Sequence, residues 1–487
     1  MNKLFSVALL LLPVALSAET AAAPAATPAV ERVIVRQQWP WSTDVKVEYS
    51  LSGVDAANPV DIKVRAFNGT VELPSGNLDA AITGDRYAVT SPVGSLTIDP
   101  VAAFGTEQVA LGNFKVQLTL TPSDSNMNDI IYKIVDLDPP YNNVDIRRSD
   151  FYNGKYGKFV TSYKAINQNF STELEDVLIW LDVTNDVYKT DKMVFRRIPA
   201  AGKSYMMQTN NTSVNGGVGI KVTFSRDFYI GVYEVTQAQM NKFYRWWGND
   251  RAYSDYPPKV TDGYWKAQYC NSFETNEMYR AMRPASNIGV WTGYGHAIRN
   301  ISNTKLASHE AGTGSFVGNM QNKTQLLVDL PTEAMWEYAC RAGTSTDLYT
   351  GQVLKNGSTY YYERLDDICC QYRITTDRNC DLSVGSAIVG SYKPNAWGLY
   401  DMIGNIYEWC LDKEVSVDNL PGGTDPLYDS STSSKHVLRG NSWNYNVNYN
   451  TSFSRVIYNA NYEANTTNKG FGIRLCIYLE RNDGGTL

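Results

Sequence analysis

Three segments in the first third of the chain alternate apolar and polar residues without a break. The pattern runs through residues 45–51, 60–66 and 114–120. Successive side chains of a β-strand point to opposite faces of a sheet, so each segment predicts a strand with one buried and one solvent-facing side. Turn signals such as Asn68-Gly69 separate the segments. The sequence therefore predicts an antiparallel β-sandwich over residues 33–137, which contains no cysteine and no catalytic-looking cluster.

The N-terminus has the pattern of a secretory signal peptide. Lys3 precedes an apolar run over residues 4–16, and small residues follow at 15–18. This run is too short to span a bilayer comfortably, which disfavours an uncleaved anchor. We predict a signal peptide at 1–18 and a flexible Ala/Pro/Thr-rich leader at 19–32. The mature protein is expected to be exported, with no membrane span.

Charge and histidine content narrow the function classes. Lys and Arg number 44 against 50 Asp and Glu, and they form no basic cluster, so a nucleic-acid partner is not expected. The chain has 33 Tyr and 11 Trp but only 3 His, which leaves little room for histidine-based metal chemistry.

Seven cysteines all lie in the second half of the chain. In an exported protein this pattern predicts disulfides with one thiol left over, and a bridge from Cys370 to Cys380 would close a short loop. A metal site at Cys369, Cys370 and Cys380 is the weaker alternative, because no histidine is nearby and the spacing is atypical. The full set is Cys270, Cys340, Cys369, Cys370, Cys380, Cys410 and Cys476.

The second half has a different pattern. A polar connector at 138–190 leads into an α+β domain at 191–480, and residues 481–487 form a tail. Thr236 and Gln239 form a predicted capping box before a helix, and Thr332 is the predicted cap of a second helix. Residues 360–362, three consecutive tyrosines, fit either a pocket lining or an edge strand.

Motifs in this half resemble the formylglycine-generating-enzyme (sulfatase-modifying factor) family. They occur in order from residue 191 to residue 480, and the resemblance implies a variant of the C-type lectin fold. The motifs are FYIGVYEVT at 228–236, LPTEAMWEYACR at 330–341, WGLYDMIGNIYEW at 397–409, RGNSW at 439–443 and GIR at 472–474.

The resemblance does not extend to the family's founding oxidation of a sulfatase cysteine. That reaction uses two copper-binding cysteines, and the corresponding positions here are Tyr445 and Asn450. Tyr and Asn cannot replace a thiolate as nucleophile or soft-metal ligand. A related branch uses a three-histidine iron site, but His296, His309 and His436 lie far apart in sequence. Neither copper nor iron is expected, and catalysis stays open.

A calcium site is implied by the same resemblance, in a structural role. The family's calcium loop matches Asp401 and Glu408 as carboxylate ligands and Gly404 and Ile406 as carbonyl ligands. Calcium prefers such hard oxygen ligands. The alternative is a glycine turn with ordinary surface acids.

Residues 441–468 carry nine Asn and four Tyr among 28 residues. A buried strand does not tolerate that many amides, so much of the segment should face solvent between two core motifs. Tyr and Asn are typical of antibody-like binding surfaces. The segment also resembles the variable region of proteins diversified by retroelements; the alternative is a merely Asn-rich polar loop. The predicted contact residues are Trp443, Tyr445, Tyr449, Asn450, Tyr458 and Tyr462.

These observations favour an exported, non-catalytic protein that binds a protein or glycan ligand outside the cytoplasm. One alternative is a divergent sulfatase-modifying oxidoreductase that acts on an exported partner. Another is a structural cell-envelope protein.

Overall fold

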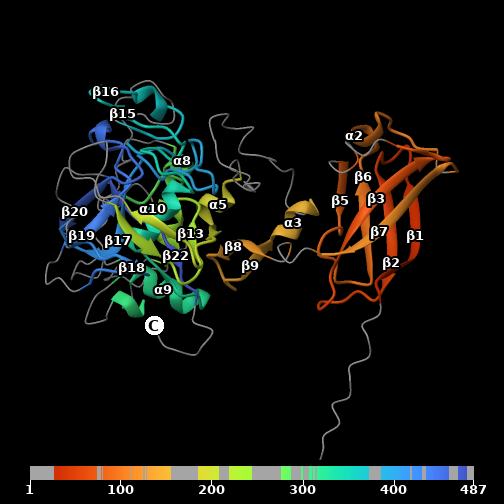
Figure 1. The fold of residues 1–487 in the computed structure, drawn as a ribbon, viewed down its shortest axis with the longest axis horizontal. Helices are drawn as coiled ribbons and strands as arrows, with labels where there is room; N and C mark the ends of the chain where they lie inside the picture. Colours follow the sequence, from red (N-terminus) through yellow and green to blue (C-terminus); the bar gives the residue numbers. More distant parts are fainter. Residues whose placement is uncertain are drawn as a thin grey trace, which may run out of the picture. The chain divides into compact units, whose positions relative to one another are not determined.

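The computed structural model divides the chain into two compact units, residues 1–127 and 128–487, and each is described by itself (Figure 1). The predicted signal peptide, most of the leader and the tail lie outside the residues that the structure describes. The described residues are 27–73, 78, 81–110, 112–123, 127, 129–154, 185–207, 219–243, 276–286, 298–299, 306–309, 311–312, 315–371, 385–416, 419–429, 435–459 and 470–479.

The first unit contains two antiparallel sheets that share one hydrophobic core. One sheet has the order β1-β2-β6-β5 and the other β4-β3-β7. A short helix, α2 (Pro100–Phe104), follows β6. The strands are β1 (Ala29–Gln37), β2 (Val45–Ser52), β3 (Val60–Asn68), β4 (Val71–Glu72), β5 (Ile82–Gly84), β6 (Val93–Ile98) and β7 (Phe114–Pro122).

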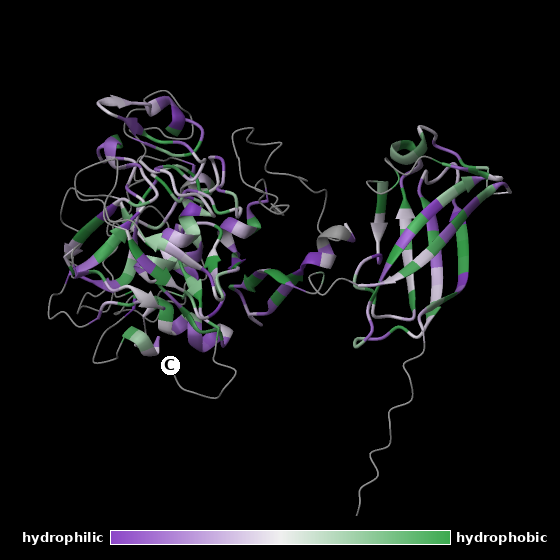
Figure 2. Ribbon diagram, in the orientation of Figure 1, coloured by the Kyte–Doolittle hydropathy of each residue, from purple (hydrophilic) through white to green (hydrophobic). Residues whose placement is uncertain are grey.

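The predicted alternation is present in the strands of this unit. Every second residue is buried in β2 from Val45 to Leu51 and in β3 from Val60 to Ala66. In β7, Phe114 and Leu118 are buried. Val116 and Leu120, which point to the same face, are half-buried. Figure 2 shows the resulting change between hydrophobic and hydrophilic positions along the strands.

The second unit contains a six-stranded sheet of order β14-β22-β13-β10-β8-β9. β8 (Ile130–Asp136) pairs with β10 (Lys192–Ile198), and β9 (Asn143–Arg147) pairs with β8. The prediction that residues up to 137 belong to the sandwich, with a connector from 138, is therefore corrected. The burial pattern of β8 does not alternate, so periodicity gave no sign of this strand or of the sheet that it joins.

Three smaller sheets and several short helices complete the second unit. The sheets have the orders β11-β12-β18, β15-β16 and β20-β19-β17-β21. Its other strands are β11 (Ser204–Met207), β12 (Ile220–Thr223), β13 (Phe228–Gly231), β14 (Val328–Asp329), β15 (Lys355–Asn356), β16 (Thr359–Tyr360), β17 (Tyr407–Lys413), β18 (Gly423–Thr424), β19 (Lys435–Arg439), β20 (Arg455–Asn459), β21 (Phe471–Gly472) and β22 (Cys476–Ile477). Its helices are α3 (Arg148–Tyr152), α5 (Val187–Thr190), α6 (Gln237–Phe243), α8 (Glu277–Ala281), α9 (Phe316–Thr324) and α10 (Glu333–Arg341), with 3₁₀ turns η2 (Leu306–Ser308), η3 (Tyr362–Leu365) and η5 (Val447–Tyr449).

Both predicted helix caps are present. The Gln239 backbone N–H donates to the Thr236 hydroxyl at 3.2 Å, and the Thr236 N–H donates to the Gln239 side chain at 3.1 Å. This reciprocal pair is the capping box expected at the start of α6. The Met335 N–H donates to the Thr332 hydroxyl at 3.2 Å, which caps α10.

The prediction of disulfides with a single leftover thiol is wrong. Four of the seven cysteines, Cys340, Cys369, Cys410 and Cys476, are free and buried. They pack as small apolar side chains in the core of the second unit. Cys270 and Cys380 lie outside the described residues, so the predicted bridge from Cys370 to Cys380 stays a prediction.

None of the helices in the described part of the chain is long and apolar enough to cross a membrane.

Candidate functional site

The segment that begins at residue 441 leaves one strand of a sheet and returns to it as the next strand. It follows β19, passes through η5 and comes back as β20, which pairs antiparallel with β19 in the register His436↔Tyr458. Both ends of this excursion are therefore held by the same sheet. The sequence between 441 and 454 is a short connection on a rigid base.

Two tyrosines project from this connection into solvent. Tyr445 is 47% exposed and Tyr449 is 53% exposed. Their ring centroids are 6.0 Å apart, and Tyr445 also makes an edge contact with the buried Tyr407 at 5.8 Å. The exposed pair thus rests on a buried ring, which restricts how far either side chain can move.

The other predicted contact residues do not share this exposure. Trp443 is 9% exposed and packs in a small buried cluster with Tyr392 and Ile406. Asn450 is fully buried, accepts a hydrogen bond from the Asn441 side chain and donates one to the Cys369 sulfur at 3.6 Å. The prediction that Trp443 and Asn450 contact a ligand is corrected, because both are core residues.

Tyr458 and Tyr462 were predicted to contact the same ligand. Tyr458 on β20 is half-buried and makes an edge contact with Phe471 at 4.8 Å. Phe471 lies against Tyr407 at 5.7 Å, so Tyr458 continues the row of rings that begins at the exposed pair. Tyr462 lies outside the described residues.

Two further tyrosines, both half-buried, lie beside this exposed pair. The Tyr362 hydroxyl donates to the Asn448 side-chain oxygen at 2.6 Å, and Asn448 lies in η5 next to Tyr449. Tyr360 stacks on Tyr362 at 5.2 Å with an interplanar angle of 10°. We call Tyr360, Tyr362, Tyr445 and Tyr449 the tyrosine surface. The tyrosine run at 360–362 was visible in the sequence, but its position beside Asn448 was not.

Two cations lie over tyrosine rings at the 360–362 side of this surface. The Lys355 amine lies 4.9 Å from the centroid of Tyr360, and the Arg364 guanidinium lies 4.1 Å from that of Tyr361. Both distances are within the range of cation–π contacts. The tyrosine surface therefore combines flat rings with fixed positive charge and amide groups.

Beneath the tyrosine surface are two buried polar groups without a hydrogen-bond partner, the Tyr407 hydroxyl and the Trp443 Nε1. Burial, followed by the nearby Tyr445 and Tyr449, raises the pKa of Tyr407. The phenol is therefore neutral and keeps its proton as a donor. An unmade buried hydrogen bond costs about 1–3 kcal/mol, so these two groups lower the stability of the fold beneath the tyrosine surface.

The predicted calcium ligands fit that ion only in part. One Asp401 oxygen accepts from the Gly390 N–H at 2.7 Å, and the other is buried without a partner. Both Glu408 oxygens are occupied, because they accept from Arg474 at 2.7–3.1 Å and one also accepts from the Trp336 Nε1 at 2.6 Å. Glu408 is therefore not free to bind calcium in this arrangement. No group of three or more His, Cys, Asp or Glu among the described residues is arranged to hold a metal ion.

Burial disfavours the charged form of the Asp401 carboxyl. Desolvation is the largest cause that raises its pKa, to about 6, and the charge of Glu408 adds to the effect. Desolvation also raises the pKa of the neighbouring buried Glu234, followed by the charges of Asp401 and Glu408. Arg474 offsets part of this negative charge. A cation bound at Asp401 would offset more of the buried negative charge. This is the one respect in which the predicted calcium site fits the structure.

Cys369, which accepts a hydrogen bond from Asn450, and Cys340 are not activated thiols. Burial raises the pKa of Cys369, and it raises the pKa of Cys340 to about 12. A thiolate is the reactive form of cysteine, so these side chains are inert at neutral pH.

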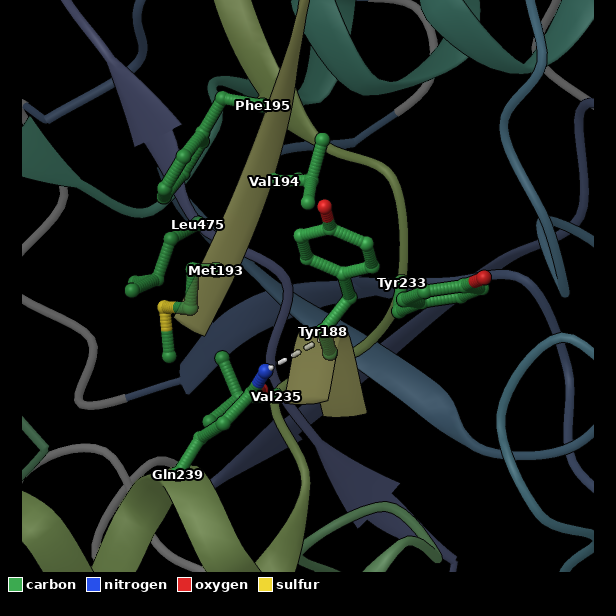
Figure 3. A pocket seen from close by; sticks show the side chains of 9 residues that line it. Tyr188, Met193, Val194, Phe195, Tyr233, Val235, Gln239 and Leu475 are labelled. Atoms are coloured by element: carbon green, nitrogen blue, oxygen red, sulfur yellow. Dashed lines mark hydrogen bonds between the residues drawn. The ribbon is translucent and has the colours of Figure 1, made fainter. Parts of the chain in front are cut away.

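A small cavity in the second unit lies between β10, β13 and α6 (Figure 3). Its walls are mostly apolar, and the Gln239 amide inside it donates to the backbone oxygens of Tyr188 at 3.2 Å and Lys192 at 2.8 Å. The Gln239 amide therefore stabilises the fold and is not free to bind a ligand in the cavity. None of the residues of the tyrosine surface lines this cavity.

Comparison with known proteins gives one long match and several short ones. The profile of the sulfatase-modifying factor enzyme 1-like domain matches residues 184–479. The formylglycine-generating enzyme of Streptomyces coelicolor is 32% identical over 115 residues, which are 23% of this chain and 35% of that protein. The inactive C-alpha-formylglycine-generating enzyme 2 of Bos taurus is 32% identical over 116 residues, 23% of this chain and 32% of that protein. The chain thus matches about a third of the length of these relatives.

Two solved structures are similar at low identity. PvdO from Pseudomonas aeruginosa is 20% identical, with a TM-score of 0.40 over 59% of this chain and 94% of that chain. Treponema denticola variable protein 1 is also 20% identical, with a TM-score of 0.39 over 59% of this chain and 95% of that chain.

The family profile covers more than half of the chain, and the ordered motifs lie within it. The chain therefore belongs to the sulfatase-modifying factor enzyme 1-like family.

Proposed function

We propose that this chain is an exported, non-catalytic binding protein that presents the tyrosine surface to a protein or glycan ligand outside the cytoplasm. One observation carries the proposal. Tyr445, at a position where the family resemblance implies a catalytic cysteine, is 47% exposed beside an equally exposed Tyr449. Large aromatic side chains on a rigid base give contact area at a low entropic cost.

The chemistry around the surface favours binding over oxidation. Asn450, at the other implied cysteine position, is buried and hydrogen-bonded. The free Cys369 beside it is a buried thiol with a raised pKa. A thiol-dependent copper oxidation needs accessible thiolates, which the described cysteines do not supply.

The binding role can be tested by a matched pair of tyrosine variants. Full-length protein is screened on a glycan array and on an array of bacterial surface proteins, and Tyr449→Ala is then measured on the retained ligand. We expect at least a tenfold loss of affinity, because exposed aromatic anchors carry much of the energy of an interface. Tyr279→Ala on α8 is the control, since Tyr279 is 49% exposed and lies outside the tyrosine surface.

Equal affinity in both variants would remove the tyrosine surface from the site. Copper binding with oxygen consumption on a cysteine-containing peptide would support the oxidoreductase alternative instead.

We further propose that the segment around η5 is diversified, as in retroelement variable proteins. Its exposed positions hold Tyr and Asn, whereas the buried Asn441 and Asn450 hydrogen-bond to each other. Deep sequencing of the 3′ end of the gene in a natural population is the test. We expect changes at Tyr445, Asn446 and Tyr449 but constancy at Asn441 and Asn450, and a uniformly constant segment would contradict diversification.

We retain calcium as a structural proposal in a reduced form. Asp401 would supply the carboxylate, Gly404 and Ile406 would supply carbonyl oxygens, and Glu408 would stay with Arg474. The ion would neutralise buried charge and cross-link the loop. Calcium chloride should raise the melting temperature of the wild type but not of Asp401→Asn, whereas an equal response of both proteins would rule out this ligand set.

A further inference from the structure

The β-sandwich carries two exposed tryptophans that neither the family resemblance nor the proposed ligand surface explains. Trp41 is 88% exposed and Trp39 is 37% exposed, both in the loop between β1 and β2. Tryptophan has the largest apolar side chain, and leaving its ring in water forgoes the free energy that burial of the ring would release. Such a residue on a well-formed domain indicates a contact with another molecule.

This loop shares one end of the sandwich with α2. The strand register pairs Gln37 of β1 with Val45 of β2, and Val45 with Ile98 of β6. Because β1 and β6 both end there, the tryptophan loop and α2 lie at the same end, and Figure 1 shows α2 at one end of the sandwich. Val101 on α2 is 49% exposed and adds a third apolar side chain there.

Hydrogen bonds fix the base of the tryptophan loop. The Gln37 side-chain amide donates to the backbone oxygens of Thr43 and Glu107, and its oxygen accepts from the Val109 N–H at 3.1 Å. The Ser42 N–H donates to the Gln38 oxygen at 2.9 Å, which closes a turn around the tryptophans. Gln37 therefore ties two loops together, and the rings are presented on an ordered support, which lowers the entropic cost of binding.

The charge at this end is negative. Asp44 follows the loop, and the register of β2 and β6 places it opposite Asp99. Glu107 lies in the loop that Gln37 holds. Two cations on the adjoining strands, Arg36 and Lys46, each lie 3.3 Å from Glu48 and share that single carboxylate. The formal charges of these four acidic and two basic side chains sum to about −2.

We propose that this end of the sandwich, formed by Trp39, Trp41 and the carboxylates of Asp44, Asp99 and Glu107, docks a basic segment of a partner protein. Arginine or lysine side chains would lie over the indole faces, and their charges would be complemented by the neighbouring carboxylates. The same carboxylates disfavour an anionic bilayer or a nucleic acid, both of which attract basic surfaces. This site is separate from the tyrosine surface and does not depend on its function.

The test uses full-length protein and an unlabelled decapeptide of alternating arginine and glycine, measured by calorimetry. We expect saturable binding that weakens as sodium chloride is raised from 50 to 500 mM. Trp41→Ala should weaken binding at least fivefold, and the double variant Asp44→Asn/Glu107→Gln should weaken it and flatten the salt dependence. An alternating glutamate and glycine decapeptide should not bind.

Val93→Ala is the matched control. Val93 is 64% exposed, and it lies at the start of β6, at the other end of the same sandwich. Its affinity for the arginine peptide should equal that of the wild type, and equal melting temperatures should show that all variants fold. Unchanged arginine-peptide binding in Trp41→Ala would overturn the proposal. So would Trp41-dependent binding to phosphatidylcholine vesicles or a neutral β-glucan in place of the peptide.

Discussion

The two units of this chain bury very different side chains. In the described part of the sandwich, Arg86 is the one charged side chain that is buried, and the core is otherwise formed mainly by aliphatic residues. The second unit buries complete ion pairs, among them Arg299–Asp329 and Arg474–Glu408, all with fully buried side chains. A regular sheet satisfies its own backbone, whereas an irregular domain needs side chains to satisfy backbone groups. Arg474 illustrates this, because it donates to the backbone oxygens of Gly231, Val232 and Tyr400.

This comparison predicts that single charge deletions are far more harmful in the second unit. Arg474→Met leaves Glu408 buried without its cation and should cost about 3–5 kcal/mol of unfolding free energy. Arg65→Met in the sandwich removes the exposed pair with Glu72 and should leave the unfolding midpoint unchanged. Hydrogen exchange resolved by peptide distinguishes the two units, and equal effects of the two variants would contradict the comparison.

The sandwich should be most sensitive to the loss of apolar volume. Ile62 on β3 is 1% exposed within its core. Ile62→Ala removes buried methyl groups and leaves a cavity, so we expect a loss of about 2–4 kcal/mol in this unit. Exchange protection in the second unit should not change, and binding at the tyrosine surface should be retained. Simultaneous loss of protection in both units would show that they do not unfold independently.

His436 should contribute less to the stability of the second unit as the solution becomes acidic. All three histidines lie outside the sandwich, so this contribution is confined to the second unit. Burial, with smaller contributions from the charges of Lys413 and Arg299, lowers the pKa of His436 to about 3, although its Nδ1 lies 3.0 Å from the Leu411 oxygen. The unfolded chain takes up a proton near pH 6.5 and the folded chain does not, so stability falls as pH falls from about 6.5 towards 3. At pH 5 this contribution is a loss of about 2 kcal/mol relative to pH 8.

The variant His436→Gln separates the contribution of His436 to the pH dependence of stability from an opposing contribution of Asp412. Burial, followed by the charge of Glu333, raises the pKa of Asp412 to about 7, so the folded state holds a proton that the unfolded state releases above about pH 4. Asp412 therefore adds stability as pH falls through that range. The change in unfolding free energy from pH 8 to pH 5, measured with urea, should be more favourable by about 2 kcal/mol in His436→Gln than in the wild type. Identical changes in the two proteins would exclude a contribution from His436.

Removal of a helix cap should cause the smallest losses of unfolding free energy. Here the loss should be larger in the sandwich than in the second unit. Asp99 alone accepts from the Val101 and Ala102 N–H groups at the start of α2, so Asp99→Ala should cost about 1 kcal/mol. Thr332→Ala should cost about 0.5 kcal/mol, because Asp412 still accepts from the Glu333 N–H at the start of α10. Chemical denaturation of both variants measures this, and a larger loss in Thr332→Ala would contradict the shared cap.

Part of the candidate site could be predicted from its residues. The composition of 441–468 indicated an exposed segment, and Tyr445 and Tyr449 are exposed as expected. Composition could not show that Asn450 is buried, because the exposed Asn446 is the same residue type. The segment around η5 is a turn without a regular period, so only the packing against Tyr407 and Asn441 decides which side chains face solvent.

Part of the local structure, and the family, could be predicted from the order of the amino acids. Alternation specified β2 and β3, Thr236 and Gln239 specified a helix start, and the ordered motifs identified the family, because each of these signals acts between residues close in the chain or survives as a fixed order. Long-range packing determines that β8 joins the second unit, that Glu408 pairs with Arg474, and that Tyr362 contacts Asn448. These contacts join residues between 56 and 86 positions apart, where neither periodicity nor local propensity carries information about which partner a side chain meets.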